Sequence, residues 1–67
     1  MIKKTELIGK YVSYMYFGSY RTHKVVRVYG NTLTVRDAVG VKHRIHPKTT
    51  KILGRQFPKR GLEPIEW

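Results

Sequence analysis

The side chains best able to do chemistry in this chain are cations, and acids are almost absent among them. The sequence has 14 Lys and Arg against 4 Asp and Glu in 67 residues, which is a formal net charge of +10. Asp37 is the one acid between Lys10 and Arg60, because the other acids lie near the termini. Self-repulsion on this scale opposes compaction, and a polyanionic partner would relieve it. The composition therefore favours binding to a polyanion.

Catalytic and metal-binding arrangements are hard to assemble from the remaining polar side chains. The chain has no Cys, so it has neither a disulfide framework nor a thiolate site. His43 and His46 are three residues apart, which on a strand places them on opposite faces, and no acid cluster completes a metal site. A metal-free ribonuclease that uses His23 or His46 with lysines is the catalytic alternative that stays open. We expect a protein that is not an enzyme and that needs no metal or cofactor.

Three short strands joined by two tight turns are predicted within Thr22–Pro47. Gly30-Asn31 suits a two-residue type II′ turn, and Ala38-Val39-Gly40 suits a three-residue loop with its Gly in the left-handed conformation. These turns predict the pairs Tyr29–Thr32, Val28–Leu33, Arg27–Thr34, Val26–Val35 and Lys24–Asp37, then Leu33–Ile45, Thr34–Arg44, Val35–His43 and Arg36–Lys42. In both hairpins the aliphatic pairs fall on one inner face.

Alternation along these strands predicts an outer face of one charge sign. With Val26, Val28, Leu33, Val35 and Ile45 inward, the outward residues are Val25, Arg27, Tyr29, Thr32, Thr34, Arg36, Lys42, Arg44 and His46. Arg36 directly opposite Lys42 is unfavourable in the free protein, and an anion bound between them would reverse that effect. Guanidinium forks, ammonium groups, hydroxyls and an aromatic ring are the groups that contact phosphates and bases. The residues predicted to bind nucleic acid are Arg27, Tyr29, Thr34, Arg36, Lys42, Arg44, His46 and Lys48.

The rest of the chain is predicted to close this sheet within one domain that spans residues 1–67. Residues 1–8 form a lead-in, residues 9–54 a barrel and residues 55–67 a tail. A first strand is expected over Lys10–Phe17 and a brief closing strand over Ile52–Gly54. The tail has two Pro and a Gly, so it is expected to be non-helical. Its apolar Leu62, Ile65 and Trp67 either pack over an open barrel end, which we favour, or form a docking peptide. Five short strands without a helix predict an all-β fold, a small five-stranded barrel.

From Gly9 to Pro47 the chain resembles the SH3-like small barrels, in particular the KOW and Tudor-like nucleic-acid-binding modules. Gly9-Lys10-Tyr11-Val12 is similar to their opening G-x-x-V, and Gly40–Pro47 is similar to their G-x-x-x-x-I-x-P exit. The glycine that KOW modules carry ahead of the second strand is His23 or Lys24 here. The resemblance implies a binding module without catalysis that contacts RNA, DNA, or polymerase and ribosome assemblies. In size and charge the chain is also similar to small phage-encoded DNA-binding proteins.

The expected function is therefore non-catalytic binding of nucleic acid through its phosphate backbone, with low sequence specificity and with DNA favoured over RNA. The alternative is an interaction module that docks on an acidic surface of a polymerase, ribosome or nucleoid protein. No apolar run approaches the length of a membrane span, and the first nine residues lack the apolar core of a signal peptide. We expect no membrane partner, and a cytoplasmic location that is nucleoid-associated if the ligand is DNA.

Overall fold

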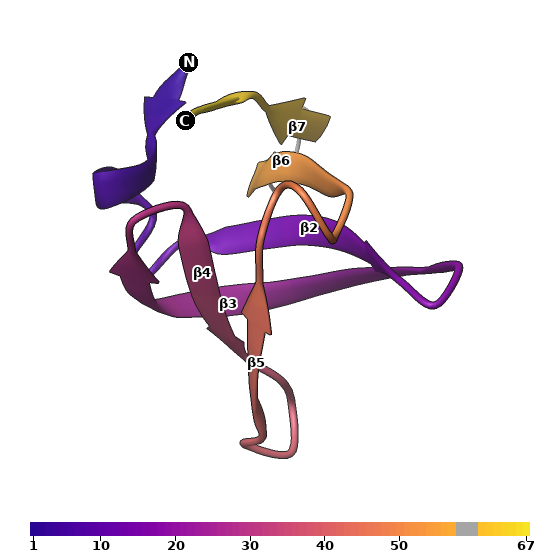
Figure 1. Ribbon diagram of the computed structural model, residues 1–67. Coiled ribbons are helices and arrows are strands. Elements are labelled where there is room, and N and C mark those ends of the chain that lie inside the picture. Colours follow the sequence, from indigo (N-terminus) through magenta and orange to yellow (C-terminus); the bar gives the residue numbers. More distant parts are fainter. Residues whose placement is uncertain (58–60) are drawn as a thin grey trace.

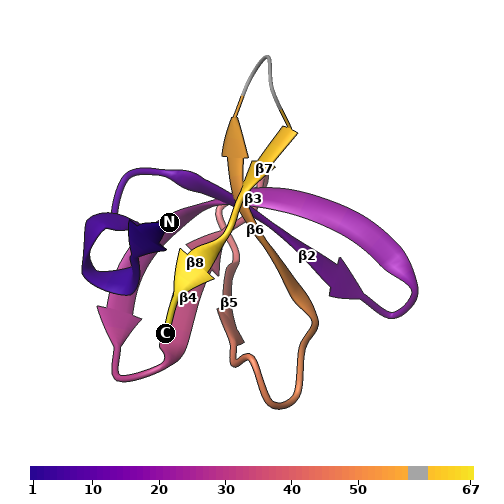
Figure 2. The same cartoon turned by 90° about the horizontal axis from the view of Figure 1, so that it is seen from above.

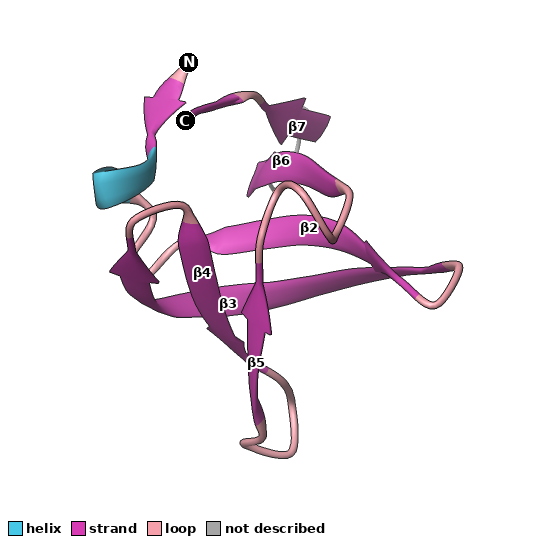
Figure 3. Ribbon diagram, viewed as in Figure 1, coloured by secondary structure: helices cyan, strands magenta, loops and turns pink. Residues whose placement is uncertain are grey.

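Tight turns and β-branched or aromatic runs alternate along the chain, and they produce an all-β structure. The computed structural model describes residues 1–57 and 61–67, and these residues contain no α-helix (Figures 1 and 3). The elements are β1 (Ile2–Lys3), a 3₁₀ turn η1 (Lys4–Glu6), β2 (Tyr11–Tyr16), β3 (Ser19–Tyr29), β4 (Thr32–Arg36), β5 (Lys42–Ile45), β6 (Ile52–Phe57), β7 (Gly61–Glu63) and β8 (Ile65–Glu66). Among the described residues, no helix has the length and apolar character needed to cross a membrane.

The strands form one antiparallel sheet and a short parallel pair. The sheet has six strands in the order β5-β4-β3-β2-β6-β7, and β1 pairs with β8 near the two termini (Figure 2). In the described part of the chain no ladder joins the edge strands β5 and β7, so the sheet is open. The predicted all-β class is confirmed, whereas a closed five-stranded barrel is not shown.

Both predicted turns form, and they set the registers of their hairpins. Gly30 has a φ of 57° and Gly40 a φ of 90°, left-handed values that favour glycine. The predicted pairs Tyr29–Thr32, Val28–Leu33 and Arg27–Thr34 follow the first turn, and all four predicted pairs follow the second. Local turn geometry was therefore a sufficient guide close to each turn.

A β-bulge in β3 overturns the predicted register farther from the first turn. Val25, not Val26, pairs with Val35, because the register shifts between Val25 and Arg27. An extra residue in one strand reverses the alternation beyond it. Val25 is consequently fully buried, although it was predicted outward, and Val26 is half-buried. The predicted pairing of Lys24 with Asp37 is also wrong, since Lys24 pairs with Arg36.

The core lies on the inner face of the sheet and includes both ends of the chain. Its buried apolar residues are Ile2, Leu7, Val12, Tyr14, Val25, Leu33, Val35 and Ile45, and Val28, Ile52 and Ile65 pack against them. The first eight residues thus contribute Ile2 and Leu7 to the core. Ile65 in the tail pairs with Ile2, whereas Leu62 and Trp67 remain about 40% exposed.

The strand β6 is longer than the predicted Ile52–Gly54, and Gly54 lets its backbone lie close to that of β7. The φ of Gly54 is 144°, and a Cβ built there would lie 2.5 Å from the carbonyl oxygen of Glu63. Only glycine permits this close approach of two backbones. The approach brings Arg55 opposite Glu63, and their side chains form an ion pair of 3.1 Å.

Candidate functional site

The outer face of β3, β4 and β5 carries two rows of polar side chains that run across the strands. Each row contains one side chain from each of the three strands. Arg27, Thr34 and Arg44 are successive cross-strand partners and form the first row. Lys24, Arg36 and Lys42 are likewise successive partners and form the second row. Adjacent strands lie about 4.8 Å apart, so each row spans roughly 10 Å. We call the two rows together the cation rows.

The first row borders two adjoining hollows. One hollow, of about 410 Å³, is lined by Arg27, Tyr29, Thr32, Thr34 and Arg44, and the other by Val26, Arg27, Thr34, Lys42 and Arg44. The guanidinium carbon of Arg27 lies 5.9 Å from the centroid of the Tyr29 ring, which is cation–π distance. This contact orients Arg27 beside the hollow while its N–H groups remain free to meet a ligand.

Asp37 lines a hollow together with Lys24 and Arg36, but no ion pair among the described residues neutralises the cation rows. The five cations are all exposed, and the ion pairs among the described residues are Asp37–His43 and Arg55–Glu63, which involve none of them. Like charges directly opposite one another on adjacent strands are unfavourable. The outer face is therefore a concentrated positive surface whose five cations have no ion-pair partner among the described residues.

The structure brings together most of the predicted binding residues but not all of them. Arg27, Tyr29, Thr34, Lys42 and Arg44 line the two adjoining hollows. Arg36 belongs to the second row, and its guanidinium lies 3.6 Å from a Cβ built at Gly40. Arg36 lines a separate hollow with Lys24, Tyr11 and Asp37.

His46 and Lys48 lie in the turn after β5 and line none of these hollows. The ring nitrogen Nδ1 of His46 accepts a hydrogen bond of 3.0 Å from the backbone N–H of Lys48. Lys24 was missed from the sequence, because the turn register alone places it opposite Asp37. The one local sign that the register was ambiguous is that two valines, Val25 and Val26, follow Lys24, and either of them could point into the core.

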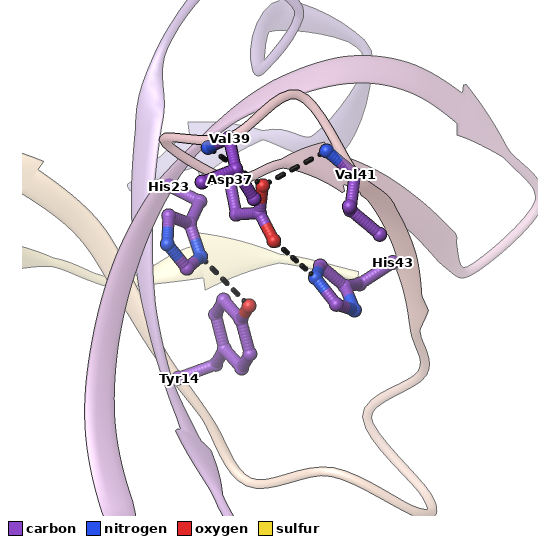
Figure 4. A network of polar contacts seen from close by, with 6 residues as sticks. All are labelled: Tyr14, His23, Asp37, Val39, Val41 and His43. Carbon is purple, nitrogen blue, oxygen red and sulfur yellow. Dashed lines mark hydrogen bonds and ion pairs between the residues drawn. The ribbon is translucent and has the colours of Figure 1, made fainter.

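A second cluster of titratable side chains lies on the inner side of the sheet, next to the β4–β5 loop (Figure 4). Tyr14 from β2 and Nδ1 of His23 from β3 share a hydrogen bond of 2.8 Å. His43 from β5 donates through Nε2 to Oδ2 of Asp37, also at 2.8 Å. The rings of His23 and His43 are stacked with centroids 6.4 Å apart. We call these four residues the histidine cluster.

Hydrogen bonding and burial determine the ionisation of this cluster. The hydrogen bond from His43, reinforced by the backbone N–H groups of Val41 and Val39, holds the pKa of the Asp37 carboxyl below its usual value. Burial raises the pKa of the Tyr14 phenol, although the positive charge of Arg21 offsets part of that effect. Asp37 therefore stays ionised and Tyr14 stays neutral at physiological pH.

The internal contacts of the histidine cluster tie β2, β3, β5 and the β4–β5 loop together. The surrounding hollow, of about 270 Å³, is lined also by Tyr16, Arg21, Ala38 and Val39, and by no lysine. His23 also lines the hollow of Lys24 and Arg36, so the ribonuclease that combines His23 with lysines stays an open alternative. In residues 1–57 and 61–67, no group of three or more His, Cys, Asp or Glu is placed to hold a metal ion.

Comparisons with known proteins identify no relative of this chain. No protein-family model matches the chain, and neither a curated protein nor a solved structure matches it. The resemblance of Gly9–Pro47 to the SH3-like modules thus stays a prediction that rests on short motifs. The cation rows and the histidine cluster are the two groups of side chains in the described structure that suggest a function.

Proposed function

We propose that this protein is a non-catalytic nucleic-acid-binding module that holds the phosphate backbone with its cation rows. The observation that carries the proposal is the pair of rows Arg27–Thr34–Arg44 and Lys24–Arg36–Lys42 on one face, whose five exposed cations have no ion-pair partner among the described residues. A row of phosphates would replace the repulsion between facing cations by charge-assisted hydrogen bonds. Thr34 adds a hydroxyl donor between two guanidinium groups.

Low sequence specificity follows from the kind of contact that these residues make. Contacts to phosphates position a protein on its ligand but carry no base information. Tyr29 is the aromatic side chain that borders the first row, so base contact on this face is limited to one ring. We place DNA ahead of RNA because the chain is similar in size and charge to small phage-encoded DNA-binding proteins. Such a ligand implies a cytoplasmic, nucleoid-associated location.

We also infer that the sheet is a variant of the SH3-like small barrel. The support is that β2 to β5 form a meander and that β6, instead of pairing with β5, crosses back to pair with β2. This pairing covers the side of β2 that would otherwise be an edge of the sheet. The extension through β7 then takes the position at the edge of the sheet.

The salt dependence of binding to a random-sequence DNA duplex tests the proposed function. Five cations that each neutralise a phosphate predict a slope of log K against log salt of about −4 to −5. The double variant Arg27→Gln/Arg44→Gln should flatten this slope by about 2, because each lost phosphate contact removes about 0.9. A slope near zero for the unaltered protein would remove the proposal.

A matched control separates this face from net charge. The double variant Lys3→Gln/Lys51→Gln removes the same charge from exposed positions that line neither hollow of the first row. It should change the slope by much less than the Arg27/Arg44 variant. Equal flattening by both variants would show that the cation rows are not the contact surface. A protein partner captured after nuclease treatment would instead favour docking on an acidic protein surface.

A further inference from the structure

The turn between β2 and β3 contains a bulky side chain where its backbone shape disfavours one. Phe17 and Gly18 form a two-residue hairpin loop closed by the pair Tyr16–Ser19, and their φ angles are 49° and 77°. Two positive φ values are typical of a type I′ turn, which strongly prefers Asn, Asp or Gly. Phe17 is the only described residue other than glycine with a positive φ. The local fold therefore bears a conformational cost at this position.

Burial in the protein does not explain this cost. The Phe17 side chain is 90% exposed, and no other large apolar residue in the described structure exceeds this value. Its ring meets the edge of Tyr16 at a centroid distance of 4.6 Å, and that ring is itself 39% exposed. Both ribbon views show the hairpin reaching away from the rest of the molecule (Figures 1 and 2). Backbone strain of this kind clusters at functional sites, so Phe17 at the end of the projecting hairpin is a candidate contact residue.

The surroundings of Phe17 indicate the chemistry of that partner. The guanidinium carbon of Arg21 lies 5.9 Å from the centroid of the Tyr16 ring, so a permanent cation accompanies the two aromatic rings. No acid lies between Tyr11 and Tyr29 in the sequence, and Asp37, which lines the hollow beside Tyr16 and Arg21, is paired with His43. The matching ligand presents a flat apolar surface beside negative charge. Nucleobases joined by phosphates have this combination, because every base has a π face that stacks on aromatic side chains.

We propose that Phe17 stacks on an unpaired nucleobase while Arg21 contacts the adjoining phosphate. This inference rests on the proposed function and adds a preference for single-stranded segments, whose bases are free to stack. The cation rows would hold the backbone, and the hairpin tip would select strands with accessible bases. Phe17 costs stability in the folded turn, and in return its ring adds affinity by stacking on one base.

The variant Phe17→Asn tests the inference, because it creates the Asn-Gly pair that type I′ turns favour. We expect its melting temperature to rise and its affinity for a single-stranded DNA oligonucleotide to fall by about 5- to 150-fold. That range corresponds to about 1–3 kcal/mol per stacked base at about 1.4 kcal/mol per factor of ten. Phe17→Tyr keeps the stacking surface and should bind the same oligonucleotide within about a factor of two of the unaltered protein.

Fluorescence gives a second readout of the same contact. An oligonucleotide with 2-aminopurine should be quenched on binding to the unaltered protein and to Phe17→Tyr, but not on binding to Phe17→Asn. The matched control Ile8→Asn removes an apolar side chain that is 56% exposed and lines none of the hollows described above, and it should leave affinity and quenching unchanged.

The outcomes separate this inference from the proposed function. Unchanged oligonucleotide affinity in Phe17→Asn, with weakened binding in Arg27→Gln/Arg44→Gln, would overturn the stacking role and leave phosphate binding intact. Absence of binding in the unaltered protein would remove both. A lower melting temperature in Phe17→Asn would overturn the argument from backbone strain. If the unaltered protein binds anionic lipid vesicles and Phe17→Asn does not, while the oligonucleotide affinity of the variant is unchanged, the hairpin tip would instead contact a membrane surface.

Discussion

Asp37 is a carboxylate whose ionised form is favoured by its contacts in the folded protein. One of its carboxylate oxygens accepts hydrogen bonds from the backbone N–H groups of Val39 and Val41, and the other accepts one from His43. These contacts lower its pKa, so its contribution to stability is present above the pKa of the unfolded chain, near 3.8. The contribution is lost as the pH falls through the lower pKa of the folded state.

The variant Asp37→Asn should therefore be less stable than the unaltered protein at pH 6, and the difference should shrink below about pH 3.8. The reason is that acid protonates the carboxylate whose charge the variant has already removed. Urea unfolding between pH 2 and pH 6 measures the difference. Glu6→Gln removes an exposed carboxylate and should have a smaller effect. A difference that stays constant with pH would contradict the assignment of Asp37.

At the scale of the element, the bulge in β3 decides which of two adjacent valines supports the core. Val25 is fully buried and pairs with Val35, whereas Val26 borders a surface hollow beside Arg27. The two residues have the same side chain and the same strand propensity, so propensity could not distinguish them. Packing against the inner face made the choice, and it also brought Lys24 opposite Arg36 into the second row.

Val25→Ala should consequently lower the free energy of unfolding by about 2 kcal/mol, from two lost buried methyl groups and the cavity they leave. Val26→Ala should lower it by less than about 1 kcal/mol, because its side chain is only half-buried. Chemical denaturation of the two variants under the same conditions compares them. The reverse order would restore the register in which Val26 pairs with Val35.

At the scale of the whole molecule, the two ends of the chain complete the core. β1 and β8 pair in parallel, and this places Ile2 opposite Ile65 against the buried cluster. A small domain buries a limited share of its surface, so each apolar contact is a large part of its stability. The tail therefore acts as part of the domain through Ile65, as the packing interpretation predicted for that residue.

Removal of residues 65–67 should lower the free energy of unfolding by about 2 kcal/mol, near the low end for an aliphatic core residue since Ile65 is half-buried. Thermal or urea unfolding measures the loss. The salt slope for duplex DNA, measured where the truncated chain is folded, should stay within experimental error because the cation rows lie on other strands. An unchanged stability would favour the interpretation of the tail as a docking peptide.

The sequence by itself determined the features that depend on neighbours a few residues away. Gly30-Asn31 and Ala38–Gly40 impose turn geometries, and strict alternation from those turns places Thr34 and Arg44 on the outer face. The all-β class follows from the same local signals. The large excess of Lys and Arg over Asp and Glu is visible in composition alone, and it supports the prediction of a polyanionic ligand.

Only the tertiary structure decided the features that depend on contacts between distant segments. The bulge at Val26, the position of Lys24 in the second row and the meeting of His23 with Asp37 and His43 all arise from packing across strands. Ile2 and Ile65 enter the core for the same reason. The physical basis is that turns act through backbone geometry within a few residues, whereas burial compares alternatives over the whole chain. Phe17 combines both, because its turn is local and its exposure is a property of the folded molecule.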